Sequence, residues 1–397
     1  MRNPVRVDAA FWLLAIFAVI YIAGNIGTGS LATWDEAVYA NISRNLLDTG
    51  NWLILHQGKA PWFDKPPLYM WCTAFFYLIL GVSEFSVRIT SSIFGVGTII
   101  LAYIFAKRIV DNSMALVAAL LLLAAPHYLH YSKMGMMDVM LTFFISLMVY
   151  LFWVGQEKPS YLFWSGAALL FAYFTKGMAA ITGIAIIFLY CVFSGNLRLL
   201  VKRQFLYGIL FSLVAILAWH IGQYLVAGSD AVKNYFGFHI FKRATTVVEG
   251  HTGGINFYQK VLFNKNKPWA VLFYASSAYM LWLALKDKDK RAILMVSWIA
   301  AVYIICTVVK TKLNWYVMPI YPALAISSAI FLSSFLKGRF YNLILAVILL
   351  GMLIQVPASW AFKLDFNAKA KEAALNSMEL PYEDDGTIFY FKTIKAR

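Results

Sequence analysis

Long apolar runs, separated by short polar segments, limit most strongly what this chain can fold into. The runs at 9–29, 87–106 and 205–226 are each long enough to cross the roughly 30 Å hydrocarbon core of a bilayer. Of all residues, 61% are hydrophobic and 13% are charged, whereas a soluble domain carries about 25% charged residues. One globular core could not hide so much apolar surface, so the sequence predicts an all-α polytopic membrane protein.

We expect about eleven transmembrane helices, because a span needs roughly 17 to 25 mainly apolar residues. The run Leu68–Leu80 is too short to be one of them. Residues 66–80 are therefore predicted to form an interfacial helix on the outer surface. The expected spans are 9–29, 87–106, 113–131, 138–155, 160–175, 178–194, 205–226, 268–285, 292–309, 316–336 and 340–357.

If that short run is not counted as a span, the basic loops all lie on one face of the membrane. The positive-inside rule makes this face cytoplasmic, with the N-terminus inside and the C-terminus outside. The net charge of +15 then suits anionic membrane lipids, while the scattering of cations over short loops argues against a nucleic-acid partner. The cytoplasmic cations are Arg2, Arg6, Lys107, Arg108, Lys158, Arg198, Lys202, Arg203, those of 286–291, Lys337 and Arg339.

The chain is expected to divide into a membrane domain at 1–357 and a short polar tail at 358–397, which resembles the start of a truncated soluble domain. Most other polar residues fall in three outer connections. These are a first loop at 30–86, a second around 132–138 and a large loop at 227–267. Three cysteines without paired spacing imply neither a disulfide framework nor a thiolate metal site.

Carboxylates in three outer segments are candidates for a reaction centre. Asp35 and Glu36 open a helical pattern in TWDEAVYA. Asp64 precedes a lysine and two prolines in PWFDKPPLYMW, and Asp138 stands at the mouth of a span in SKMGMMDVMLTFF. A carboxylate entering hydrocarbon is costly and indicates function. The simpler explanations are helix caps or a surface ion pair, the latter worth about 0–1 kcal/mol.

Cations on the same outer face run against the positive-inside trend and favour an anionic ligand. The alternatives are snorkelling lysines at helix ends and interfacial anchors. Carboxylates suit a hydroxyl nucleophile and cations suit a phosphate leaving group, a pairing that fits sugar transfer from a phospholipid carrier. The outer cations are Lys65, Lys176, Arg243, Lys310 and Lys312.

Five motifs in this order resemble the GT-C membrane glycosyltransferases, in particular bacterial enzymes of the aminoarabinose transferase and protein mannosyltransferase superfamily. The resemblance covers about residues 10–325. It implies a GT-C fold in the bacterial inner membrane, a periplasmic active site, an undecaprenyl or other polyprenyl phosphate sugar donor, and inversion at the anomeric carbon. The motifs are WDEAVYA, FDKPPLYMW, MMDVMLTFF, TKG and KTKLNWYVMPIYPAL.

The resemblance also gives expected roles to single residues. Asp35 matches a carboxylate beside the acceptor nucleophile, and Asp138 matches an acid that supports the same site. Glu36 is grouped with them as catalytic, and a charge in the first helical turn explains it equally well. Expected donor-phosphate contacts are Lys65, Lys176, Arg243, Lys310 and Lys312, and expected substrate contacts are Tyr39, Trp62, His251 and Tyr316.

A divalent metal ion is the cofactor that the resemblance implies. Asp64 with His239 matches a pair that can hold such an ion in the aminoarabinose enzymes. Asp64 replaces the Glu that is usual there, so its reach is one methylene shorter. Val38 and Trp62 stand where those enzymes have Arg and Tyr, so the sequence also departs from the family at these positions.

The expected function is transfer of a sugar from polyprenyl phosphate to a periplasmic acceptor such as lipid A or another cell-envelope glycan. One alternative is a protein O-glycosyltransferase, whose acceptor is a Ser or Thr hydroxyl. Another class is a transporter or flippase for a lipid-linked sugar. Transporters place polar groups near the membrane midplane and often show repeated halves, neither of which is visible in this sequence.

Overall fold

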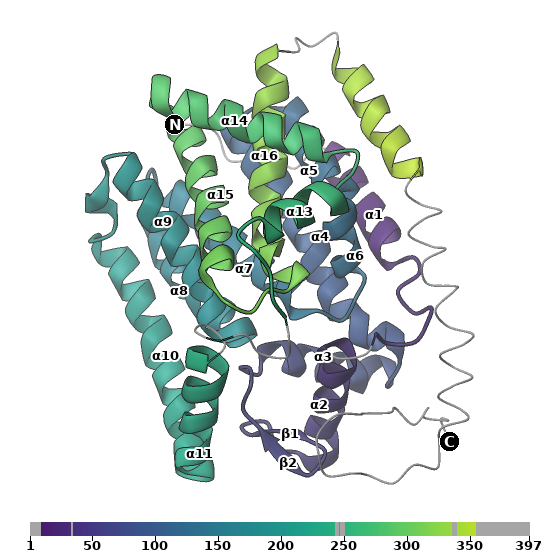
Figure 1. Ribbon diagram of the computed structural model, residues 1–397, viewed down its shortest axis with the longest axis vertical. Coiled ribbons are helices and arrows are strands. Elements are labelled where there is room, and N and C mark those ends of the chain that lie inside the picture. The colour runs from purple at the N-terminus through teal and green to yellow at the C-terminus, as the bar shows by residue number, and fades with distance from the viewer. Residues whose placement is uncertain (1–8, 33–34, 243–245, 247–250, 336–339, 355–397) are drawn as a thin grey trace.

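The computed structural model describes residues 9–32, 35–242, 246, 251–335 and 340–354, with the backbone alone for 238–242. Most of this chain is helical, and the long helices stand side by side in one bundle (Figure 1). A smaller layer of two helices and a β-hairpin lies across the lower end of the bundle (Figure 1). The predicted tail at 358–397 and Arg243 lie outside the described residues.

Among the described residues, six helical stretches are long and apolar enough to cross a membrane. A bent pair adds a seventh, and four shorter apolar helices accompany them. The protein is therefore a multi-pass helical membrane protein, and the count of eleven spans stays a prediction. Four of the six are single helices: α4 (Glu84–Ile109), α7 (Met137–Gly155), α10 (Arg203–Ala227) and α15 (Lys290–Val308). The other two are composite: Ser160–Phe193 consists of α8 (Ser160–Lys176), η1 (Gly177–Ala180) and α9 (Ile181–Phe193), and Asn314–Phe335 consists of η4 (Asn314–Ile320) and α16 (Tyr321–Phe335). The shorter helices are α1 (Ala9–Ala23), α3 (Leu68–Leu80), α14 (Ala270–Lys286) and Tyr341–Ile354.

The stretch Ser160–Phe193 turns back on itself at Gly177. Tyr190, near its end, donates a hydrogen bond of 2.9 Å to the side chain of Gln156, four residues before its beginning. In a straight helix Tyr190 would lie about 45 Å from Ser160, too far for this contact. Gly177 adopts a φ of 57°, the left-handed region that reverses the chain. The two spans predicted at 160–175 and 178–194 are thus two helices, α8 and α9, joined by a reversal at Gly177.

The span predicted at 113–131 is not one straight helix. It consists of α5 (Asn112–Ala124) and α6 (Pro126–Ser132), whose axes differ by 71°. Ala125 between them is extended, with φ −69° and ψ 110°. Pro126 explains the break, because proline lacks the N–H that would continue the helix and disfavours helical geometry in the residue before it. The predicted span is therefore bent, and it is long and apolar enough to cross a membrane only when both helices are counted together.

Polar side chains begin several of the long helices. Ser83 accepts a hydrogen bond from the amide of Ser86 at the start of α4. Asp111 does the same for α5, 2.8 Å from the amide of Met114. Such caps satisfy amides in the first turn that have no partner within the helix. Short polar breaks between apolar runs therefore fix where each helix starts.

Glycines bring α8 and α10 into backbone contact. A Cβ added to Gly208 would lie 2.1 Å from the carbonyl oxygen of Phe163, and one on Gly166 would lie 2.6 Å from the amide nitrogen of Ile209. Ser212 donates a hydrogen bond of 2.9 Å across the interface to the carbonyl of Gly166. Small residues are the usual means by which helices pack closely in lipid, where burial of apolar surface gives little driving force.

The lower layer contains α2 (Asp35–Thr49), α3 and an antiparallel hairpin of β1 (Leu55–Gln57) and β2 (Ala60–Trp62). The short helix predicted at 66–80 is confirmed as α3, which hydrogen bonds to α4 through Tyr69 with Ser91 at 2.9 Å. The hairpin, which the prediction of purely helical structure did not include, joins α2 to α3. The remaining elements are η2 (Leu197–Leu199), α11 (Ser229–Val232), η3 (Lys233–Lys242) and α13 (Phe257–Lys265).

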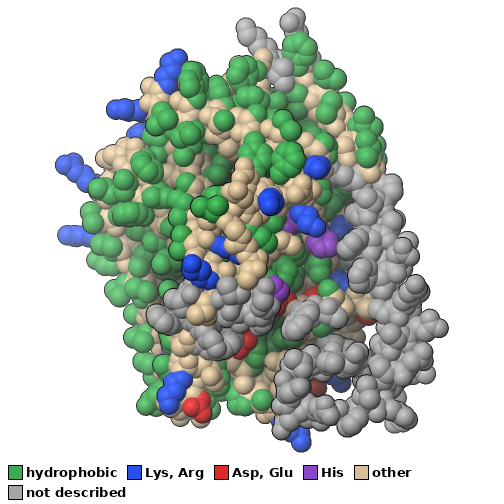
Figure 2. Space-filling view, in the orientation of Figure 1, with side chains coloured by type: hydrophobic (Ala, Val, Ile, Leu, Met, Phe, Trp, Pro, Cys, Tyr) green, Lys and Arg blue, Asp and Glu red, His purple; other side chains and the backbone are tan. Residues whose placement is uncertain are grey.

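Several basic residues meet at the opposite, upper end of the bundle. Arg108 pairs with Glu157 at 2.9 Å, and Arg291 donates to the carbonyl of Ile109 at 3.1 Å. Lys and Arg side chains also project at the upper left of Figure 2. The C-terminal ends of α4 and α7 and the start of α15 thus lie at one end of the bundle.

Candidate functional site

A buried ion pair between Asp138 and Lys176 lies at the centre of the candidate site. Asp138 is in the first turn of α7 and Lys176 ends α8. The ammonium nitrogen lies 2.6 Å from both carboxylate oxygens, and the two side chains are only 2% and 8% exposed. Removing one partner of such a pair leaves an uncompensated buried charge, which is strongly unfavourable.

Two further charged residues from the first loop approach this pair. Asp35, at the start of α2, and Lys65, just before α3, lie close enough to the Asp138 carboxylate to act on it electrostatically. Both are half-buried, and the Lys65 ammonium donates to the carbonyl of Asp64 at 3.2 Å. Four of the residues predicted to surround one site, Asp35, Lys65, Asp138 and Lys176, are therefore brought together by three separate segments of the chain.

Tyr316 and Lys312 extend the site toward the end of α15. The Lys176 ammonium lies 4.7 Å from the centre of the Tyr316 ring, within cation–π range. The ammonium of Lys312 is buried and donates to the carbonyls of Cys306 at 2.9 Å, Val309 at 2.5 Å and Thr307. Its donors thus satisfy carbonyls at the C-terminal end of α15. Lys310, predicted beside it as a phosphate contact, has an exposed side chain.

The other predicted substrate contacts occupy different surroundings. Tyr39 and Trp62 are 3% and 8% exposed and belong to the hydrophobic core. Tyr39 packs edge-on against Tyr69, and Trp62 is paired with Leu55 in the hairpin. His251 is exposed, and its carbonyl accepts a hydrogen bond of 3.0 Å from the Lys312 amide. In this structure Tyr39 and Trp62 shape the first loop from within rather than facing an open surface.

The predicted metal pair is only half described. Asp64 is half-buried, whereas the His239 side chain lies outside the described part of the structure. Within that part, no group of three or more His, Cys, Asp or Glu side chains is arranged to hold a metal ion. The metal site of Asp64 and His239 therefore stays a prediction.

Lys133, in the loop before α7, is a buried cation beside the same segment. Its ammonium donates to the Asn25 side chain at 3.3 Å and lies 5.3 Å from the centre of the Tyr21 ring. Burial lowers the pKa of Lys133 to about 8, because the charged form loses its hydration. This loop thus has a side chain whose charge is costly, in addition to the carboxylate of Asp138.

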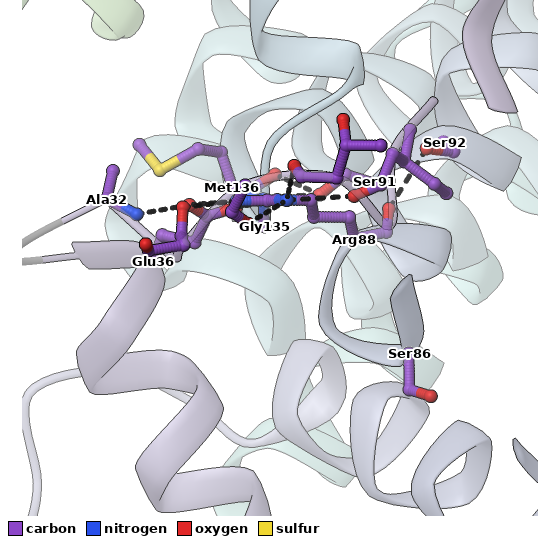
Figure 3. Close-up of polar contacts among 12 residues, drawn as sticks. Ala32, Glu36, Ser86, Arg88, Ser91, Ser92, Gly135 and Met136 are labelled. Atoms are coloured by element: carbon purple, nitrogen blue, oxygen red, sulfur yellow. Dashed lines mark hydrogen bonds and ion pairs between the residues drawn. The ribbon is translucent and has the colours of Figure 1, made fainter. Parts of the chain in front are cut away.

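Glu36 forms a second buried ion pair with Arg88 of α4. Arg88 Nε lies 2.8 Å from one carboxylate oxygen and Nη2 lies 3.3 Å from the other (Figure 3). Both side chains are almost completely buried. Glu36, predicted to be catalytic, is therefore enclosed by partners. Arg88 was not among the predicted residues, although an arginine within an apolar run is itself a signal of function.

The comparisons with known proteins relate this chain to membrane glycosyltransferases. The family model described as dolichyl-phosphate-mannose-protein mannosyltransferase matches residues 64–221. That range includes Lys65, Asp138 and Lys176, while Asp35 precedes it.

Two relatives illustrate the extent of the sequence similarity. An uncharacterised protein of Aquifex aeolicus is 29% identical over 82% of this chain and 64% of its own length. The undecaprenyl phosphate-alpha-4-amino-4-deoxy-L-arabinose arabinosyl transferase 2 of Proteus mirabilis is 26% identical over 80% of this chain and 58% of its own length. The chain thus spans somewhat less than two thirds of these proteins.

The likeness extends to the fold. ArnT from Cupriavidus metallidurans, solved with undecaprenyl phosphate, matches with a TM-score of 0.77 and 22% identity, over 88% of this chain and 64% of that one. The Archaeoglobus fulgidus oligosaccharyltransferase matches 88% of the chain and 54% of its own, with a TM-score of 0.55 and 12% identity. The chain therefore has the GT-C fold, and its sequence is similar to those of the ArnT-like arabinosyl transferases and of the protein mannosyltransferase family.

Proposed function

We propose that this protein transfers a sugar from a polyprenyl phosphate donor to an acceptor on the outer side of the membrane. The observation that carries the proposal is the Asp138–Lys176 pair with Asp35 and Lys65 within electrostatic reach. Glycosyl transfer from a lipid phosphate needs a group that orients an acceptor oxygen and cations that stabilise a departing phosphate. The site offers both kinds of side chain in one place.

The proposed reaction is a direct displacement with inversion. An acceptor oxygen forms a bond to the anomeric carbon while the bond from that carbon to the phosphate oxygen breaks. The bonding electrons leave with the lipid phosphate. Asp35 orients the acceptor and takes its proton when the acceptor is a hydroxyl; when it is a phosphate oxygen, Asp35 only positions it.

Lys65 and Lys176 are proposed to stabilise the negative charge that develops on the departing phosphate. The Lys176 ammonium has three N–H donors, and the two contacts to Asp138 leave one for a phosphate oxygen. Asp138 then acts by holding that ammonium in place. Arg243 is proposed as a further phosphate contact on the sequence resemblance alone.

The named relatives support this donor class. ArnT was solved with undecaprenyl phosphate bound, and the Proteus mirabilis protein is named for an undecaprenyl phosphate-linked sugar. For the acceptor we propose lipid A or another cell-envelope glycan. The family description of a protein mannosyltransferase favours a Ser or Thr hydroxyl of a protein as the second candidate.

We also propose the finer topology. Eleven spans in the bacterial inner membrane would place the N-terminus in the cytoplasm and the site in the periplasm. The support is the gathering of Arg108, Glu157 and Arg291 at the end of the bundle away from Asp138. Charges at the two ends rather than at the midplane also favour an enzyme over a transporter.

The direct test is transfer by purified protein. The donors would be undecaprenyl phosphate-linked aminoarabinose and polyprenyl phosphate mannose, each offered with lipid A or with a Ser/Thr-containing peptide. Mass spectrometry would follow release of the polyprenyl phosphate and the mass gain of the acceptor. If no donor and acceptor pair reacts, the proposed function is wrong.

Asp35→Asn is expected to abolish transfer while leaving the affinity for polyprenyl phosphate unchanged, because the amide keeps the shape and loses the basic oxygen. Loss of a general base typically costs about 10²–10⁴-fold in rate. The matched control is Asp48→Asn on the same helix, since Asp48 is exposed and pairs with the surface residue Arg44 at 3.4 Å. Full turnover by the Asp35 variant would remove Asp35 from the reaction.

A further inference from the structure

The two carboxylates of the proposed reaction come from separate parts of the chain. Asp35 begins α2, while Asp138 lies in the first turn of α7. We propose that Arg88 is a positioning residue, which acts through Glu36 to fix Asp35 and Asp138 relative to each other. This inference rests on the proposed function, because the distance between two carboxylates matters only if both take part in one reaction.

Arg88 holds the segment that leads into α2. Its Nη1 donates to the carbonyls of Ile26 at 2.8 Å, Thr28 at 2.9 Å and Gly29 at 3.1 Å. Its Nη2 donates to the carbonyl of Ser30 at 2.8 Å. The guanidinium therefore fixes the backbone just before Asp35, in addition to its ion pair with Glu36.

Glu36 reaches the loop that carries Asp138. One carboxylate oxygen accepts the amide of Gly135 at 2.7 Å, and the other accepts the amide of Ala32 at 2.6 Å (Figure 3). Gly135 lies three residues before Asp138, and Glu36 is the neighbour of Asp35. A single carboxylate thus ties both segments to the same guanidinium.

The close packing at Gly135 leaves the loop before Asp138 little room to move relative to Glu36. A Cβ added there would lie 2.6 Å from Val87 Cγ1 and 3.1 Å from Glu36 Cγ. Val87 is the neighbour of Arg88 on α4. Hence the loop before Asp138 touches both α4 and Glu36, and a shift of either would move it.

This arrangement requires an arginine because of the number of hydrogen-bond donors that its side chain has. Guanidinium has five N–H groups in a fixed plane, whereas an ammonium has three. Arg88 makes contacts to four carbonyls and both oxygens of Glu36 while only 2% exposed. Its donors are directed at the protein itself, so it acts on the reaction through Glu36 and Asp35.

Other contacts keep the loop folded when this tie is weakened. The hydroxyl of Ser91 accepts from the amide of Met136 at 2.9 Å, and the hydroxyl of Ser92 donates to the carbonyl of Ser132 at 3.0 Å. Both serines belong to α4 and neither touches Glu36. Variants of Arg88 and Glu36 can therefore be tested in a folded protein.

The experiment compares Arg88→Lys and Glu36→Gln with the wild type and with Arg44→Lys, a control on the exposed side of α2. It measures kcat, the donor KM, thermal unfolding, and hydrogen exchange of the Ala32 and Gly135 amides. We expect both variants to lose about 10–100-fold in kcat, since a misplacement of about 1 Å can cost 10²-fold. The donor KM should stay within about two-fold, because Lys65 and Lys176 are outside the tie. Both amides should exchange faster in Glu36→Gln and stay protected in the control.

Two results would overturn the inference. One is full kcat in Arg88→Lys or Glu36→Gln while the Ala32 and Gly135 amides exchange faster. The other is a loss of kcat that matches the loss of folded protein, which would leave Arg88 a purely structural residue. Absence of turnover in the wild type would instead contradict the proposed function, and the exchange rates would still test whether Glu36 ties the two segments.

Discussion

At the scale of single residues, Gly177 allows the chain to reverse directly after Lys176. Gly177 has a φ of 57°, and a Cβ there would lie 2.2 Å from the hydroxyl of Tyr235. Backbone geometry and crowding therefore both require glycine. The packing of α8 against α7 places the ammonium of Lys176 beside the first turn of α7, and the chain reverses directly after it.

Gly177→Ala is expected to destabilise the protein by about 2–6 kcal/mol, since a non-glycine residue in the left-handed region costs roughly 1–3 kcal/mol and overpacking adds about as much. Thermal unfolding of the purified protein would measure the effect. Gly195→Ala isolates the backbone part, because Gly195 has a φ of 68° with nothing within 4 Å of an added Cβ. In a Tyr235→Phe background the excess cost at Gly177 should shrink; an unchanged cost would contradict the crowding.

Lys312 shows how a charge of the expected kind can serve another purpose. Its ammonium is held by carbonyls at the end of α15, including those of Cys306 and Val309. A cation at this position also complements the negative end of the helix dipole. The sequence predicted a phosphate contact for Lys312, whereas its contacts in the structure are those of a helix cap.

At the scale of elements, the packing of α8 on α10 depends on glycines at two facing positions. Gly208→Ala would force a Cβ to within 2.1 Å of the carbonyl oxygen of Phe163, so the helices must separate. We expect a destabilisation of about 1–3 kcal/mol, the usual cost of overpacking, measured by thermal unfolding.

Gly222→Ala on the same helix is the matched control for this prediction. An added Cβ there meets only the side chain of Leu53 at 3.6 Å, an ordinary contact. Alanine is the better helix former by about 1 kcal/mol, so this variant should be neutral or slightly more stable. Equal destabilisation by both substitutions would mean that the close approach of α8 and α10 does not hold them together.

The elements that could be predicted from the sequence are those with a local signal. The apolar run Leu68–Leu80 was recognisably too short to span, and Gly177 marked a tight turn. Pro126 is visible in the sequence as a helix-breaking residue. The mean hydropathy of the whole run hardly changes with one proline, so it does not reveal the break. The β1–β2 hairpin has strands of only three residues each, too short for an alternating pattern to stand out.

The candidate site was predictable to a similar extent: single residues could be recognised, but their long-range contacts could not. Residue types and motifs indicated Asp35, Asp138, Lys65 and Lys176 one by one. The ion pair of Glu36 with Arg88 joins positions 52 residues apart, and the contact of Glu36 with Gly135 joins positions 99 apart. Neither has a local pattern, so only the fold could reveal that Glu36 has partners on both sides.

At the scale of the whole molecule, the two ends of the bundle differ in charge and contacts, which makes the topology testable. In a Cys72→Ser background, Lys59→Cys introduces a thiol in the exposed turn between β1 and β2, and Lys288→Cys introduces one between α14 and α15. Cys191 and Cys306 are buried. A membrane-impermeant maleimide on spheroplasts should label the first variant and reach the second only after permeabilisation. The opposite pattern would invert the proposed topology.

Arg88 donates hydrogen bonds to the carbonyls of Ile26, Thr28, Gly29 and Ser30, and this affects how the sequence of the segment can change during evolution. Recognition of main-chain oxygens does not depend on which side chains the segment carries. Relatives could therefore replace most of these residues and keep the same local path of the chain. Sequence identity along this segment would then understate how closely its geometry is preserved, and superposed coordinates would be the better guide to it.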